Sequence, residues 1–484
     1  MPDRPNVVFV CSDQHGYRYT GFGGHPYVET PNLDRLAAEG VVFENAYCAS
    51  PVCTPSRASL LTGVYPSDVN SFCNSTVWDG SCPTWGTRLR EAGYRTWSTG
   101  KFDLDPAHEV GFEEVETGHG HATSPDVTSL FRRPLCYRMG ERPGVDGRSR
   151  EERHADAGLA DNAEAFLREE APETDGPWAA WVGFSQPHPP FTALEEHFEH
   201  YHPGRVEPPN VPPGHLEDQH LTFQRLRAFK RVADPVPEER VRRARAGYYG
   251  AITELDEYVG RLLEALADAG ELEDTVFVYT SDHGEMLGEH GLWYKNNLYE
   301  DAAHVPLVVA GAGLPEGEAV ETPVGHVDLV HTLLEWAGAD PPEPQRGHAL
   351  DPLVEGRRAE AEHPGYAYAE SHSEGNCTGS FMIRKGDWKY VHFTWYDDLL
   401  FDLAEDPNEF ENRIDDPAAA DVREELRDLL YEEVDPEAVT RRAFDRQEEL
   451  LEEMAREEGK GLFEELRGRL GDGQARALVD RHTG

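Results

Sequence analysis

Residues 53–57, Cys-Thr-Pro-Ser-Arg, place a thiol and a guanidinium one turn apart at the start of a predicted helix. Pro55 suits the beginning of a helix, where its missing N–H costs nothing, and Gly63 suits the left-handed residue that ends one. Cys53 then lies at a helix N-terminus, which favours anions, and Arg57 shares its face at the i, i+4 spacing. A free cysteine alone is usually a small buried apolar residue. The combination predicts an anion-binding helix start.

The pentapeptide and the Ala-Ser-Leu-Leu-Thr-Gly that follows it closely resemble the signature of the formylglycine-dependent (type I) sulfatases of the alkaline phosphatase superfamily. In that family the cysteine is oxidised after synthesis to Cα-formylglycine, whose hydrated aldehyde becomes the nucleophile. The resemblance implies this modification for Cys53, and with it a formylglycine-generating maturation enzyme as a partner. Choline-sulfatase-like and iduronate-sulfatase-like members are similar in detail. Further segments resemble family motifs, in the family order: 7–14, 93–101, 186–191, 276–283, 288–295 and 304–307.

Two pairs of polar residues resemble the metal ligands of this family. Asp13-Gln14 follows one predicted strand and Asp282-His283 follows a later one. Either Asp alone could equally cap a helix or lie in a surface turn. Carboxylate and amide oxygens suit Ca²⁺, Mg²⁺ or Mn²⁺, whereas an imidazole nitrogen favours a transition metal. The resemblance implies one divalent ion, Ca²⁺ first and Mn²⁺ or Mg²⁺ as alternatives, held by Asp13, Gln14, Cys53, Asp282 and His283.

The resemblance also assigns cations to the sulfate oxygens. Lys101 and Lys295 stand at anion-contacting positions of the family, and His188 lies in its sulfate-contacting segment. His188 or one of the lysines would protonate the leaving alcohol. Arg57 would steady the hydrate and the metal-bound carboxylates. The implied catalytic set is therefore Cys53, Arg57, Lys101, His188 and Lys295.

Three positions depart from the family pattern. Asp103 stands where a histidine that acts on the hydrate is common, and the release of sulfate depends on that proton transfer. A base at Asp103, a base supplied by His108, and a purely structural carboxylate at Asp103 are the open interpretations. Gln14 replaces the Asp of many arylsulfatases. His304 replaces an Arg. We expect it to be buried or to contact a site residue, without a direct role in the reaction.

The order of elements predicts an α/β fold. Short β-branched runs alternate with helical patterns, which favours a large, mostly parallel sheet sandwiched by helices. The resemblance makes it alkaline-phosphatase-like. The predicted elements include a helix from Thr30-Pro31 to Gly40, a buried strand over 178–184 and a helix over 243–270. Ligands of such sheets gather beyond the carboxyl ends of the strands, so the two polar pairs should converge.

A composition shift near residues 364–365 suggests a domain boundary. We predict a catalytic domain over 1–365 and a C-terminal subdomain over 366–484. Strands over 381–384, 389–393 and 399–403 predict a small antiparallel sheet within the subdomain. A polar helical tail follows from 417, either solvated or in contact with a second copy in a homo-oligomer.

Composition limits the classes of binding partner and indicates the solvent environment of the protein. The 484 residues carry a formal net charge of −46, and only six of them are lysines. A surface this acidic repels nucleic acid and anionic membranes. Together with the scarcity of lysine it indicates a halophilic, haloarchaeal-type protein, because molar salt shortens the Debye length to about 3 Å. The N-terminus lacks a leader pattern and the seven cysteines are an odd number, so we expect a soluble cytoplasmic protein without disulfides.

These observations predict a sulfuric ester hydrolase that cleaves sulfate monoesters of small molecules or saccharides. One alternative is a phosphonate monoester or phosphodiester hydrolase of the same superfamily. Another is a catalytically idle relative whose Cys53 stays a thiol and which only binds anions. The sequence does not identify the alcohol that leaves. Loose candidates to contact it, each more typical of packing, are Trp78, Trp293, Tyr294 and His372.

Overall fold

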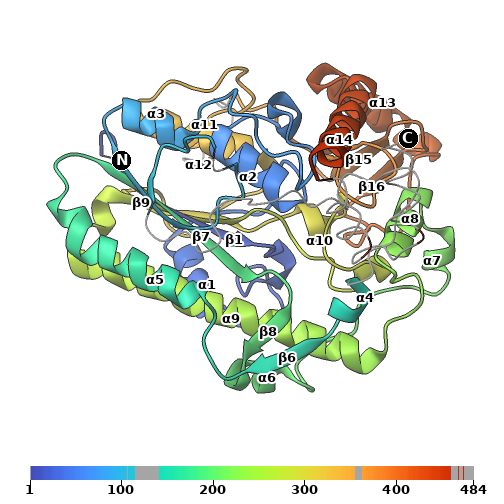
Figure 1. Ribbon diagram of the computed structural model, residues 1–484, viewed down its shortest axis with the longest axis horizontal. Helices are drawn as coiled ribbons and strands as arrows, with labels where there is room; N and C mark the ends of the chain where they lie inside the picture. The colour runs from blue at the N-terminus through green and yellow to red at the C-terminus, as the bar shows by residue number, and fades with distance from the viewer. Residues whose placement is uncertain are drawn as a thin grey trace.

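A central eight-stranded sheet organises the protein (Figure 1). The computed structural model describes residues 2–105, 107–114, 141–354 and 362–458, with 467 and 473. Cys136, Lys460 and the end of the predicted tail lie outside these residues. The strands lie in the order β11 (Glu318–Val320), β2 (Gly40–Phe43), β10 (Leu307–Gly311), β9 (Thr275–Ser281), β1 (Asn6–Asp13), β7 (Trp178–Pro187), β4 (Arg95–Gly100) and β5 (Glu113–Glu114).

The predicted mostly parallel sheet is confirmed, with one exception. Strand β10 pairs antiparallel with both β2 and β9, while the other neighbouring pairs are parallel. Strands buried on both faces read as continuous apolar runs in either direction. The apolar run of β10 therefore carries no signal for the direction of the strand.

Alternate residues of β1 build two separate cores. Val7 and Phe9 pack with helices on one face of the sheet, whereas Val8 and Val10 pack with helices on the other. Each such fully buried apolar side chain contributes about 1.5–3 kcal/mol relative to an exposed one. The helices of the first face are α2 (Cys53–Thr62), α3 (Trp85–Glu91) and α11 (His326–Ala337); those of the second are α1 (Pro31–Ala38), α5 (Asp156–Ala165) and α9 (Glu238–Ala269) (Figure 1).

Two predicted helix ends are confirmed by left-handed glycines. Helix α2 ends at Gly63, with φ 75°, and α9 ends at Gly270, with φ 76°. Helix α9 begins at Glu238, before the predicted start at 243. The apolar stripe did not reveal this start because residues 238–243 are all charged except Val241, which is partly buried. At α1 the Thr30 hydroxyl accepts from the Gly21 N–H instead of capping the helix.

Four neighbouring parallel strands place the functional residues. Strands β9, β1, β7 and β4 lie side by side and point the same way, so their carboxyl ends form one edge of the sheet. Asp13 ends β1, and Asp282, His188 and Lys101 directly follow β9, β7 and β4. Residues far apart in the chain are thereby brought to one edge, as expected for this fold class.

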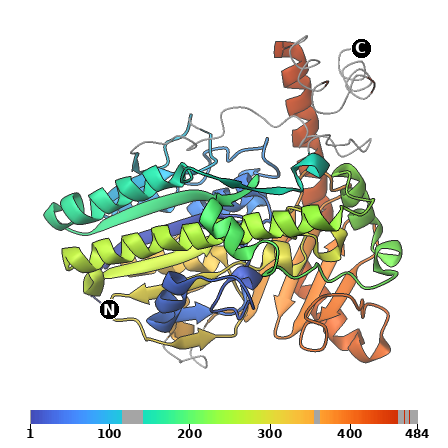
Figure 2. The same ribbon diagram turned by 90° about the horizontal axis from the view of Figure 1, so that it is seen from below.

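The predicted C-terminal antiparallel sheet is present and begins at Tyr366. Its strands are β13 (Tyr366–Ser371), β14 (Ser380–Lys385), β15 (Trp388–Phe393) and β16 (Leu399–Asp402). Helices α13 (Ala420–Glu433) and α14 (Pro436–Glu458) follow, and Figure 2 shows α14 projecting from the body. The division into two domains at 365 stays a prediction. None of the helices in the described ranges has the length and apolar character needed to span a bilayer.

Shorter elements complete the described chain. They are β3 (Ala46–Tyr47), α4 (Glu141–Gly144), β6 (Gly147–Arg150), β8 (Phe191–Leu194), α6 (Glu195–Tyr201), α7 (His215–Asp218), α8 (Leu221–Phe229), α10 (Glu300–Ala303), β12 (Val324–Gly325) and α12 (Asp351–Val354). The six cysteines among the described residues are all buried free thiols.

Candidate active site

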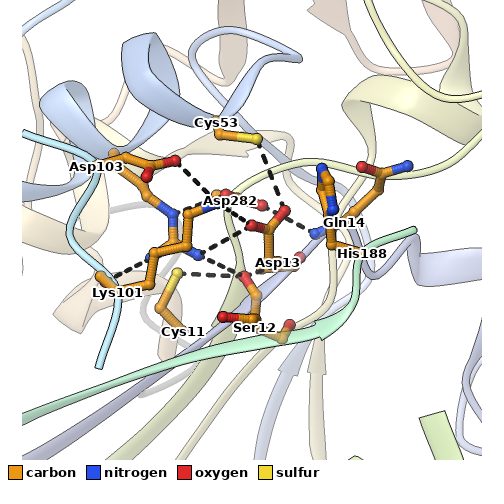
Figure 3. Close-up of polar contacts among 12 residues, drawn as sticks. Cys11, Ser12, Asp13, Gln14, Cys53, Lys101, Asp103, His188 and Asp282 are labelled. Carbon is orange, nitrogen blue, oxygen red and sulfur yellow. Dashed lines mark hydrogen bonds and ion pairs between the residues drawn. The ribbon is translucent and has the colours of Figure 1, made fainter. Parts of the chain in front are cut away.

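Four buried side chains converge at the edge formed by β9 and β1. One potential ligand atom from each of Asp13, Cys53, Asp282 and His283 lies within 4.8 Å of the others; Figure 3 shows three of the four. Ligands on opposite sides of a calcium ion are separated by about 5 Å, since each bond is about 2.3–2.6 Å long. The spacing and the chemistry of this donor set therefore fit a single divalent cation.

The thiol of Cys53 contacts this cluster directly. Its Sγ lies 3.2 Å from Nε2 of His283, 3.4 Å from Nζ of Lys295 and 3.7 Å from Oδ1 of Asp13. Helix α2 begins at Cys53, two residues before the start expected from Pro55. The predicted placement of Cys53 at the helix N-terminus holds, and this end of the helix adds to the local preference for negative charge.

Electrostatics favour the thiolate form of Cys53. Burial and the Asp13 carboxylate each raise the pKa of this thiol. The positive charges of Lys295 and Lys101, followed by that of His283, lower the pKa by more, to about 6 instead of 9.0. The site is thus built to hold an anionic group at this position.

His283 presents a nitrogen suited to metal binding. Its Nδ1 lies 3.0 Å from the carbonyl oxygen of Gly284. Because a carbonyl only accepts, Nδ1 carries a proton, so Nε2, which lies close to Cys53 and Asp13, is the ring nitrogen that a metal ion would bind. Burial lowers the pKa of His283, but Asp282 raises it above the ordinary value. A proton would therefore compete with a metal ion for Nε2.

Arg57 joins helix α2 to two strand ends. Its Nε donates to Oδ2 of Asp282 at 2.8 Å, and its Nη1 donates to the carbonyl oxygen of Lys101 at 2.7 Å. The side chain is fully buried, so both contacts are protected from water. Arg57 therefore orients a metal-site carboxylate and the end of β4 together.

Lys101 and Asp103 lie next to each other on the Asp13 side of the cluster (Figure 3). The ammonium of Lys101 hydrogen-bonds Asp13 and lies 2.9 Å from the Asp103 carboxylate. Burial raises the pKa of Asp13, but Lys101 and then His188 lower it well below its usual range. The alternative base, His108, packs against the Trp78 ring, with the ring centres 5.3 Å apart. Of the two residues, Asp103 is the one placed beside a site residue.

His188 is more open to solvent than the buried cluster. It is an exposed residue whose Nδ1 lies 2.7 Å from the carbonyl oxygen of Pro189, and Figure 3 shows its ring on the Gln14 side of Asp13. Its effect on the pKa of Asp13 also places it close to the cluster. An exposed histidine there could meet an incoming ligand.

The loose candidates for the leaving group, and His304, make packing contacts. Trp78 donates to the Cys82 carbonyl oxygen, and Trp293 and Tyr294 pack on Phe191. The ring of His372 packs on Phe72. The ring of His304 stacks on Tyr17, with the ring centres 4.3 Å apart, and its Nδ1 lies 3.3 Å from the Glu300 carboxylate. The packing interpretation of these five residues agrees with their contacts.

Two site residues were missed by the sequence analysis. The hydroxyl of Ser56 donates to the backbone oxygen of Asp282, and the buried carboxylate of Glu285 accepts from the Gln14 amide. Glu285 follows Asp282-His283 by two residues, which was the available signal. Nothing in the local pattern showed that its side chain turns back toward β1.

The sulfatase family profile matches residues 5–339, and the profile of the C-terminal region of N-sulphoglucosamine sulphohydrolase matches 288–435. Choline-sulfatase of Rhizobium meliloti is 33% identical over 443 residues, which cover 86% of this chain and 83% of the relative. Arylsulfatase K of Homo sapiens is 30% identical over 84% of this chain and 78% of its own. The protein belongs to the sulfatase family, and these relatives support sulfatase activity.

Solved structures agree with the fold. A phosphonate monoester hydrolase from Silicibacter pomeroyi superposes with a TM-score of 0.73 at 27% identity, covering 89% of this chain and 95% of the other. The corresponding enzyme of Agrobacterium radiobacter gives 0.72 at 28% identity, covering 89% and 96%. The predicted α/β class with a C-terminal antiparallel sheet is confirmed.

Proposed function

We propose that this sulfatase hydrolyses sulfate monoesters through a formylglycine formed at Cys53. The observation that carries the proposal is the position of Cys53 Sγ, within 3.2–3.7 Å of His283, Lys295 and Asp13. As a hydrated aldehyde, residue 53 would supply the oxygen nucleophile. The cations that favour an anion at this position would favour the deprotonated hydrate in the same way.

The proposed metal ligands are Asp13, Gln14, Asp282 and His283, together with residue 53. A bound divalent ion would polarise the sulfuryl oxygens and lower the pKa of the hydrate. Three oxygen-bearing side chains favour Ca²⁺, with Mn²⁺ or Mg²⁺ as alternatives. Arg57 holds Asp282 in place by the 2.8 Å contact, which supports a role in orienting the ligand set.

Two lysines and a histidine are proposed to bind the sulfate and to protonate its leaving group. Lys101 contacts Asp13 and Lys295 contacts Gln14, and both ammonium groups would stabilise charge on the sulfate oxygens. His188, at the solvent side, would donate a proton to the departing alcohol oxygen. Substrate binding would require the lysines to exchange their present contacts for sulfate oxygens.

Asp103 is proposed as the base that replaces the usual histidine. Its carboxylate lies 2.9 Å from Lys101 and is partly exposed, at 18% of the side chain. Replacing Asp103 with Asn should slow turnover after a first burst of released alcohol, whereas a purely structural carboxylate would leave no burst.

The second candidate is a phosphonate monoester or phosphodiester hydrolase using the same groups. It is favoured by the fold similarity to two phosphonate monoester hydrolases at 27% and 28% identity. Aryl sulfate, aryl phosphonate and phosphodiester turnover should be compared on one preparation. We expect the sulfate to have the highest kcat/KM, and a preference for the phosphonate would reverse the assignment.

Peptide mass spectrometry across residues 53–57 tests the central step. Protein from its native host, or coexpressed with a formylglycine-generating enzyme, should carry the aldehyde at residue 53. A thiol in protein from the native host would instead support the idle, anion-binding alternative. The substrate panel should include small-molecule and saccharide sulfates at molar KCl, because we propose a halophilic, cytoplasmic enzyme.

A further inference from the structure

The side-chain amide of Gln14 has only one orientation that its neighbours accept. Its Nε2 donates to Oε2 of Glu285, and its Oε1 accepts from Nζ of Lys295 at 2.5 Å. A carboxylate can only accept and an ammonium can only donate. A flipped amide would face an acceptor with its oxygen and a donor with its nitrogen, so the two neighbours determine the orientation.

Glu285 is itself held rigidly. The residue is fully buried, and its Oε1 accepts the backbone N–H groups of Leu287 at 2.8 Å and Tyr294 at 2.7 Å. These contacts aim Oε2 at Gln14. Tyr294 directly precedes Lys295, so the Glu285 carboxylate both accepts from the Gln14 amide and holds the backbone next to Lys295, the other residue that orients the amide.

Hydrogen bonds hold both backbone groups of Gln14 in place. Gln14 adopts φ 73°, a left-handed conformation that is strained for a residue other than glycine. Its N–H donates to Oδ1 of Asp282 at 3.0 Å, and its carbonyl oxygen accepts from the Tyr248 hydroxyl at 2.6 Å. With both backbone groups held, the orientation of the amide decides whether oxygen or nitrogen of residue 14 faces Lys295.

We infer that Glu285 is a positioning residue that keeps the Gln14 amide oxygen turned toward the metal site. The inference rests on the proposed function, in which Gln14 is a ligand. An amide oxygen binds hard cations, whereas an amide nitrogen has no available lone pair. Loss of such outer partners typically weakens metal affinity by about 10–100-fold.

The E285Q variant tests the orientation. The introduced amide can keep its oxygen on the N–H groups of Leu287 and Tyr294, which turns its own NH₂ toward residue 14. Gln14 must then present its oxygen to that NH₂ and its own NH₂ to the metal site. After removal of metal with a chelator, Ca²⁺ or Mn²⁺ alone is titrated back and followed by calorimetry. We expect E285Q to bind the ion about 10–100-fold more weakly than the parent.

The same exchange in a Q14E background separates orientation from a general structural role. A carboxylate at residue 14 offers oxygen in both directions, so the amide introduced at residue 285 can donate to it without removing a ligand. In the Q14E protein, adding E285Q should therefore leave ion affinity unchanged or raise it. If E285Q alone does not fold, Q14E/E285Q decides: it should fold and bind the ion.

The matched control is E289Q, which alters a buried glutamate four residues further along. Glu289 pairs with Arg245 at 2.5 Å and accepts the Asn210 N–H at 2.8 Å, away from Gln14. The ion affinity of E289Q should stay within about threefold of that of the parent, a much smaller change than the one expected for E285Q. Three outcomes would overturn this inference but leave the proposed function standing. They are an unchanged ion affinity in E285Q, an equal loss of affinity in both backgrounds, and an unfolded Q14E/E285Q protein. Failure of the parent to bind either ion would overturn the proposed metal site as well.

Discussion

Sγ of Cys53 lies 3.2 Å from Nε2 of His283, although 230 residues separate them in the chain. The contact exists because helix α2 begins directly above the carboxyl ends of β1 and β9. It joins the residue proposed to be modified to the proposed metal ligands, and the predictions below depend on it.

Replacing Cys53 with Ala should abolish sulfatase activity. The nucleophile would be absent, so kcat/KM should fall by more than about 10³-fold. The control is C48A, which removes another buried thiol, one that is 4.0 Å from the Ala302 oxygen. Steady-state kinetics on an aryl sulfate compare the two variants. Substantial activity in C53A would refute the proposed nucleophile.

Lys101→Met should reduce both turnover and product binding. Loss of a positioned cation typically lowers kcat by about 10²–10³-fold. Inhibition by inorganic sulfate should weaken as well, because the same ammonium would contact the product. K385M is the control, since Lys385, the last residue of β14, pairs with Glu425 of helix α13 and is more exposed than Lys101. An unchanged sulfate inhibition constant in K101M would count against direct contact.

Arg57→Ala should destabilise the fold. The change leaves the buried Asp282 carboxylate without its 2.8 Å partner, and breaking a buried pair costs about 3–5 kcal/mol. Urea unfolding measures the difference. R168A, which removes a partly exposed partner of Glu164, should cost much less than R57A, because solvent screens the pair. A loss below that of R168A would show that Asp282 does not depend on Arg57.

Protein carrying an unmodified Cys53 should show a thiolate titration near pH 6. The pKa of the Cys53 thiol in the folded state lies below the ordinary 9.0. The thiolate therefore contributes its full stabilisation above about pH 9.0, and this contribution is lost as the pH falls through about 6. The difference in ultraviolet absorbance between parent and C53A reports the thiolate. In K295M the midpoint should move up. A midpoint near 9.0 in the parent would contradict the site electrostatics.

Salt should stabilise the protein. A formal net charge of −46 repels itself, and raising KCl from about 0.1 M to about 1 M shortens the Debye length from about 10 Å to about 3 Å. The melting temperature should therefore rise over this range. An uncharged osmolyte at equal osmolarity controls for effects unrelated to charge. A melting temperature that is flat or falling with KCl would remove the support for a halophilic protein.

Much of the framework could be read from local sequence. The runs before Asp13 and Asp282 have the apolar character of buried strands, and Gly63 and Gly270 mark helix ends by a conformation that glycine adopts readily. The direction of β10 was not predictable, because a continuous apolar run looks the same in both directions. The true start of α9 was also hidden, because Val241 is the one apolar residue among 238–243.

The sequence by itself determined which chemistry the protein carries: a cysteine at a helix start, two strand-end polar pairs and two lysines kept in a chain that otherwise avoids them. These are properties of short segments, and short-range spacing specifies them. The tertiary structure alone decided which groups meet. Glu285 turns back to hold Gln14, His108 packs on Trp78 and Asp103 lies beside Lys101. Such contacts depend on strand order and side-chain direction over hundreds of residues, which no local pattern encodes.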